Sequence, residues 1–194
     1  MNTADTDLTP FGFGKAPAIL TLQGTPLEQG CVAPIDAIGG YSTSCGPAGT
    51  LVSGNNKYAT PTLASLGVTS FATLGILLNI NDPGSTQQAT LQNLMLTLYG
   101  GTDGTDALFH FSLVAPQDLA NIAMGQGAAG FIITIADDQI PASGFDGLLR
   151  VGLSATIGCT AGTAAPCNVP GQFSTGGGPD SFTVADLGGK CLGS

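Results

Sequence analysis

Residues 149–157, Leu-Arg-Val-Gly-Leu-Ser-Ala-Thr-Ile, decide the fold that this sequence predicts. Apolar side chains occupy every second position of the stretch: Leu149, Val151, Leu153, Ala155 and Ile157. Successive side chains of a β-strand point to opposite faces, so this spacing puts all five on one face. The stretch therefore predicts a strand with one face in the core.

The same period of two recurs along the chain, with turn residues between the repeats. Strands are predicted around residues 16–23, 74–81, 93–99, 109–113, 131–135 and 182–184. The GGTDGTD turn of residues 100–106 joins two of them into a hairpin. The β-α-β alternation of a parallel sheet is absent. The sequence predicts an all-β fold, an antiparallel β-sandwich with a jelly-roll-like arrangement.

The length of 194 residues predicts one sandwich domain, residues 16–194. Residues 1–15, which contain Pro10 and two glycines, predict a flexible N-terminal arm. One short helix is predicted over residues 116–124, because Pro116 lies near its start and Leu119, Ile122 and Ala123 have helical spacing.

Five cysteines indicate an exported protein whose loops are stapled by disulfides. Cys31 and Cys45 enclose one loop, Cys159 and Cys167 enclose a second, and Cys191 is left over. The alternative for the first pair is two buried free thiols. The N-terminus lacks the basic and apolar regions of a signal peptide, so export implies that the signal has been removed.

The charge balance argues against several classes of partner. The net charge is −9, and the chain has only four basic residues. Nucleic-acid binding needs clustered lysine and arginine to displace counterions, so it is not expected. No apolar run reaches the roughly 18 residues of a membrane helix, so no membrane span is expected either.

The motifs that would carry catalysis are weak. Residues 125–130 match G-x-G-x-x-G, but a dinucleotide fingerprint follows a strand, and here a strand comes after it. His110 is the only histidine, and no nucleophile-elbow motif is present. A single glutamate, Glu28, disfavours glycoside hydrolysis. We expect no enzymatic activity and no cofactor, with calcium as the one candidate ligand.

That candidate rests on two pairs of turn carboxylates, Asp103 with Asp106 and Asp137 with Asp138. Carboxylates and backbone carbonyls of turns are the oxygen ligands that Ca²⁺ takes. The alternative is turn chemistry alone, which also favours aspartate at such positions.

Self-association is the expected partner interaction. An extended N-terminal segment can add as a strand to a neighbour's sheet. Its candidate contacts are Phe11, Phe13, Ile19, Leu20 and Leu22, with Cys191 as a free thiol. The alternative is that residues 16–23 pair within their own sheet.

From Leu74 onward the chain resembles exported bacterial proteins of the PEP-CTERM type. The matching stretches are ILLNINDPG (76–84), TLQNLMLTLYGGTDGTDALF (90–109), GQGAAGFIITIADDQ (125–139), LLRVGLSATI (148–157) and GGGPDSFTVADL (176–187). The resemblance implies a secreted β-sandwich ectodomain, here without the family's sorting tail, and brings no catalytic residues.

Together these observations predict a secreted, non-enzymatic structural subunit of an extracellular or cell-surface assembly, with a filament as one form. The alternative is a monomeric extracellular binding module for calcium or polysaccharide.

Overall fold

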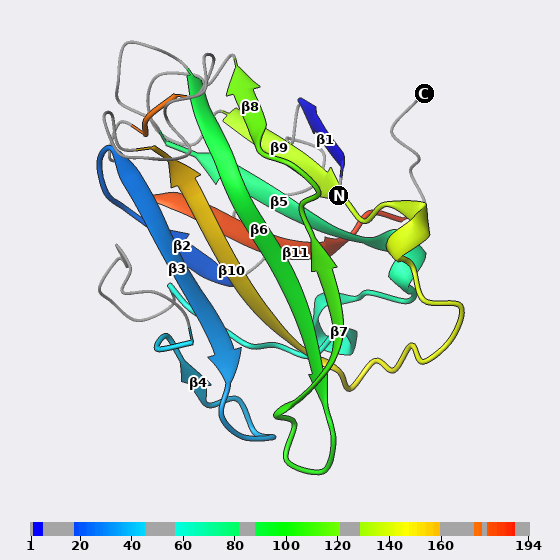
Figure 1. The fold of residues 1–194 in the computed structure, drawn as a ribbon. Helices are drawn as coiled ribbons and strands as arrows, with labels where there is room; N and C mark the ends of the chain where they lie inside the picture. Colours follow the sequence, from blue (N-terminus) through cyan, green and yellow to red (C-terminus); the bar gives the residue numbers. More distant parts are fainter. Residues whose placement is uncertain are drawn as a thin grey trace.

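The fold is built from two antiparallel sheets that pack face to face (Figure 1). The computed structural model describes residues 2–5, 18–45, 57–81, 88–120, 129–159, 173–175 and 178–188. The all-β antiparallel sandwich predicted from the alternating apolar residues is confirmed.

The first sheet has five strands in the order β1-β9-β5-β11-β2. Their bounds are β1 Asn2–Asp5, β2 Leu20–Leu22, β5 Leu74–Ile80, β9 Ala129–Thr134 and β11 Asp180–Asp186. Neighbours in this sheet are distant in sequence, so the chain crosses between the two sheets repeatedly. β1 and β2, which are consecutive in sequence, lie at opposite edges.

The second sheet has six strands in the order β4-β3-β10-β6-β7, and β8 pairs with the other end of β6. Their bounds are β3 Leu27–Pro34, β4 Tyr41–Ser42, β6 Gln88–Gly100, β7 Asp106–Ser112, β8 Gln117–Ala120 and β10 Arg150–Gly158. β10 is central in this sheet, and its bounds confirm the strand predicted at residues 149–157. The β6–β7 hairpin is also as predicted, and Gly101 (φ 85°) and Gly104 (φ 71°) take the left-handed conformations of its turn.

One continuous core lies between the sheets. Leu153 and Leu96 from the six-stranded sheet face it, as do Ile76 and Phe182 from the five-stranded sheet. Phe71 closes one end, with its ring centroid 5.0 Å from that of Phe109.

Three short 3₁₀ helices complete the described part: η2 Ala64–Leu66, η3 Phe71–Thr73 and η4 Asp137–Gln139. In the residues that the structure describes, no helix has the length and apolar character needed to cross a membrane.

Two sequence-based predictions differ from the structure. The helix expected over 116–124 is wrong for Gln117–Ala120, which form strand β8 against β6. A segment of four residues cannot be assigned by periodicity, and pairing with the long β6 decides its conformation. Residues 2–5 of the expected flexible arm form β1, which pairs with β9.

Candidate functional site

The predicted cysteine staple near the N-terminus is present. Cys31 and Cys45 form a disulfide with their Cα atoms 5.9 Å apart. It ties the middle of β3 to the segment after β4. Cys159 is also disulfide-bonded, whereas its predicted partner Cys167 and the leftover Cys191 lie outside the described residues.

The four candidate calcium ligands stay in two separate places. Asp103 lies in the β6–β7 turn, where its Oδ1 accepts a hydrogen bond from the Thr105 N–H, and Asp106 begins β7. Asp137 and Asp138 are exposed in η4. Hydrogen bonds from Thr105 lower the pKa of Asp103, which is the expected effect of turn chemistry. Within the described ranges, no group of three or more histidine, cysteine or acidic residues is placed to hold a metal ion.

Three of the apolar side chains expected to contact a neighbouring subunit are instead buried within their own chain. Ile19, Leu20 and Leu22 are completely buried, and β2 pairs with β11 of the same chain. The described strand therefore follows the alternative in which this segment pairs within its own sheet. Phe11 and Phe13 lie outside the described residues.

Strand β1 forms the edge of the five-stranded sheet through its pairing with β9 (Figure 1). Asn2 faces Thr134 and Asp5 faces Phe131 in an antiparallel register. The sheet order places β1 four strands away from β2, and residues 6–19 connect the two.

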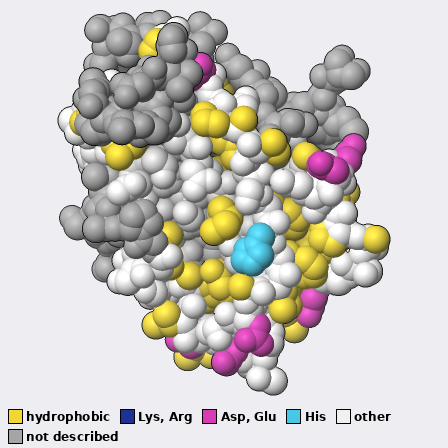
Figure 2. Space-filling model, in the orientation of Figure 1, with side chains coloured by type: hydrophobic (Ala, Val, Ile, Leu, Met, Phe, Trp, Pro, Cys, Tyr) yellow, Lys and Arg dark blue, Asp and Glu magenta, His cyan; other side chains and the backbone are white. Residues whose placement is uncertain are grey.

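The outer face of the six-stranded sheet is uncharged around the single histidine (Figure 2). His110 is exposed on β7, and its Nδ1 lies 3.2 Å from the Thr97 Oγ1 on β6. Tyr99 lies two residues further along β6, and burial raises its pKa although a hydrogen bond with Thr97 acts in the opposite direction. The side chain that contacts the His110 ring is thus a hydroxyl on an open sheet surface.

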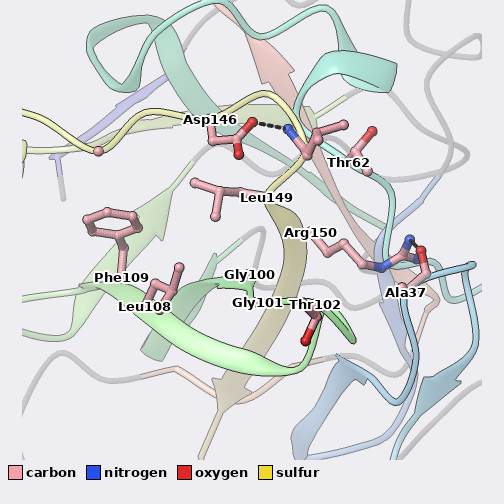
Figure 3. A pocket seen from close by; sticks show the side chains of 13 residues that line it. Ala37, Thr62, Gly100, Gly101, Thr102, Leu108, Phe109, Asp146, Leu149 and Arg150 are labelled. Carbon is pink, nitrogen blue, oxygen red and sulfur yellow. Dashed lines mark hydrogen bonds between the residues drawn. The ribbon is translucent and has the colours of Figure 1, made fainter.

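A cavity of about 560 Å³ opens beside the β6–β7 hairpin (Figure 3). Leu108, Phe109 and Leu149 form an apolar side, and glycines of the hairpin turn form another. Phe109 is fixed from behind by Phe71. Leu108 and Leu148 are large apolar residues with 51% and 74% of their surface exposed. The cavity is therefore apolar, with exposed leucines on its lining.

Arg150, the first residue of β10, also lines this cavity and is only 7% exposed. Its Nη2 donates to the Thr60 Oγ1 (2.8 Å) and its Nη1 to the Ala37 carbonyl (3.2 Å). Among the described residues, its buried Nε has no hydrogen-bond partner. Figure 3 shows the guanidinium beside Ala37, away from the Phe109 ring. A buried cation with an unsatisfied donor is energetically costly, which makes Arg150 an unusual charged group.

Asp36 is the nearby acid, and backbone groups hold its carboxylate. The N–H groups of Ile38, Gly39 and Gly40 all donate to its Oδ1. The pKa of Asp36 lies below its ordinary value, chiefly because of the Gly40 hydrogen bond, with Arg150 contributing least. Its carboxylate therefore caps the 36–40 turn.

Sequence reasoning missed this cavity because its residues come from separate segments of the chain. One signal was present in the sequence: the only arginine of the chain lies between two apolar residues of the alternating stretch 149–157. Its position places it on the face opposite the core, where a surface cation is expected. The loop of residues 36–40 covers it instead, as the hydrogen bond to Ala37 shows.

Comparison of the chain with protein-family models, with curated proteins and with solved structures finds no match. The resemblance to PEP-CTERM-type exported proteins therefore stays a prediction from sequence motifs.

Proposed function

We propose that this protein is a secreted, non-enzymatic structural subunit of an extracellular or cell-surface assembly, in which copies exchange strand β1. The observation that carries the proposal is the β1–β9 pairing, which attaches a four-residue strand to a sheet edge. Main-chain hydrogen bonds provide such an attachment and are the same whether the strand comes from its own chain or from a second copy.

Chain length supports exchange between copies. β1 and β2 lie four strand spacings apart in the sheet, which is a distance of roughly 19 Å at about 4.8 Å per spacing. The connection of residues 6–19 has a maximum reach of roughly 46 Å at about 3.3 Å per residue. That reach exceeds the span within one sheet, so it permits β1 to pair with β9 of an adjacent copy. A head-to-tail contact of this kind extends into a filament when it does not close.

Secretion rests on the Cys31–Cys45 disulfide, since disulfides persist mainly in oxidising compartments. The area around His110 in Figure 2 shows no charged side chain, which favours close packing of subunits there. The PEP-CTERM resemblance points to the same setting.

A cross-linking experiment distinguishes exchange between copies from pairing within one chain. Asn2 and Thr134 face each other across β1 and β9, so one copy carries Asn2→Cys and another carries Thr134→Cys. We expect the mixture to form a disulfide-linked dimer under oxidising conditions, because strand exchange brings the two new thiols together. Peptide mass spectrometry identifies the linked residues.

The matched control pairs Asp5→Cys with Thr134→Cys, because Asp5 faces Phe131 and lies three residues out of register. We expect little or no dimer from this control, and each variant alone corrects for the native cysteines. A double variant, Asn2→Cys/Thr134→Cys, that cross-links only within single chains at every protein concentration contradicts exchange between copies.

A further inference from the structure

We propose that the cavity beside Arg150 binds a small organic monocarboxylate. The ligand's carboxylate lies on the Arg150 guanidinium, and its apolar body packs on the side formed by Leu108, Phe109 and Leu149. This binding is separate from strand exchange, since the cavity lies on the six-stranded sheet and β1 on the other.

The charge of Arg150 provides the first argument. Within the described part of the chain, Arg150 has no carboxylate at ion-pair distance; its hydrogen bonds go to a hydroxyl and a carbonyl. Guanidinium has five N–H donors in a planar fork, and the described hydrogen bonds to Ala37 and Thr60 use only one N–H each of Nη1 and Nη2. Each terminal nitrogen therefore keeps one N–H for a ligand, whereas Nε is fully buried and has no partner among the described residues. Carboxylate is the group that matches this fork, because it accepts two parallel hydrogen bonds and neutralises the charge.

The size and lining of the cavity provide the second argument. Its volume of about 560 Å³ lies within the range of roughly 300–1,000 Å³ for small-molecule sites. Phe109 is held in place by Phe71, so the apolar side exists before any ligand arrives. The exposed Leu108 and Leu148 offer further apolar surface that a ligand would remove from water.

The other charged group of the cavity limits the ligand to one negative charge. Asp146 lines the cavity, and its Oδ1 accepts a hydrogen bond from the Leu148 N–H (2.8 Å). A dicarboxylate or a phosphate would bring additional negative charge close to Asp146, with only one cation to balance it. The structure therefore favours a monocarboxylate with an apolar body over more highly charged anions.

The first test uses the unaltered full-length chain and three probes: benzoate, phenylacetate and hexanoate. Their neutral amides, benzamide, phenylacetamide and hexanamide, are the matched controls. Ligand-observed saturation-transfer NMR and calorimetry work for assembled or monomeric protein, so the result does not depend on strand exchange. We expect at least one acid to bind about tenfold to hundredfold more tightly than its amide, because a hydrogen bond to a charged group is lost in the amide. Absence of binding by all three acids, or equal affinity for acids and amides, overturns the proposal.

The second test locates the site without altering Arg150, whose replacement also removes the support of the 36–40 turn. Leu148→Glu places a negative charge on the lining, while Val114→Glu places the same charge at another exposed apolar position, outside the cavity lining. We expect the first variant to weaken acid binding by about tenfold and the second to bind like the unaltered chain. Equal affinity of the two variants for the acid overturns the assignment to this cavity.

Discussion

Asp186, at the end of β11, joins two neighbouring segments through its carboxylate. Its Oδ2 accepts from the Thr69 N–H and hydroxyl, both at 3.0 Å, and its Oδ1 accepts from the Gly188 N–H at 2.6 Å. Burial raises the pKa of Asp186, but these hydrogen bonds outweigh it and leave the pKa below the ordinary 3.8. A folded-state pKa below the unfolded one means that the unfolded chain binds more protons in this range. The stabilisation is therefore present above about pH 4 and is lost as the pH falls through the folded-state pKa.

We expect Asp186→Asn to lower the free energy of unfolding by about 1 kcal/mol at pH 6, because a charged acceptor at a solvent-accessible site is lost. The variant should also show a smaller loss of stability between pH 6 and pH 3 than the unaltered chain. Urea unfolding at the two pH values measures both effects, and Asp137→Asn on η4 controls for the loss of one negative charge. An identical pH dependence in Asp186→Asn and the unaltered chain contradicts this role of the carboxylate.

The sequence predicted apolar core residues well and buried charged residues poorly. Leu153 and Phe111 follow from alternation alone, because their own strands determine which face they occupy. Glu28 is completely buried, and its Oε1 accepts a hydrogen bond from the Thr175 hydroxyl 147 residues away. Arg150 likewise depends on the distant Thr60 and Ala37. Such partners come from the assembled fold, so no local pattern predicts them.

Whether a strand could be predicted from the sequence depended on its length and on its pairing in the fold. β5 and the β6–β7 hairpin were predicted because each has several alternating apolar residues and a turn signal. β3 was not among the predicted strands, and its sequence LEQGCVAP contains polar residues, glycine and proline. Pairing with β10 from Leu27↔Gly158 to Val32↔Leu153 makes it a strand. Tertiary pairing thus overrides weak local preference for this strand and for β8.

The Cys31–Cys45 disulfide stabilises the β3–β4 connection. The two cysteines are 14 positions apart, and the loop-entropy model gives about 3 kcal/mol for a closed loop of about 15 residues. We expect the double variant Cys31→Ala/Cys45→Ala to lose about that much free energy of unfolding. Substitution is preferable to a reducing agent, because Cys159 is also disulfide-bonded.

Urea unfolding at neutral pH measures the loss, with Ser44→Ala as a control for altering the same segment. A double variant as stable as the unaltered chain would show that the loop is already restricted in the unfolded state.

The protein carries few charged residues, and most of them are negative. The chain carries a net charge of −9, and its one arginine is buried at the cavity. Copies therefore repel one another at long range, while the proposed β1–β9 exchange uses main-chain hydrogen bonds that carry no net charge. These two contributions respond differently to salt.

We expect assembly to increase with salt concentration. The Debye length is about 30 Å at roughly 10 mM salt and about 8 Å at roughly 150 mM, so added salt screens the repulsion between copies and leaves the strand pairing largely unaffected. Sedimentation velocity at the two salt concentrations measures the assembled fraction, and a variant lacking residues 2–5 is the control, which should stay unassembled in both. Assembly that decreases with salt would instead indicate ion pairs between subunits. Equal assembly of the variant lacking residues 2–5 would exclude β1 as the connecting strand, because that variant has no donor for the β9 edge.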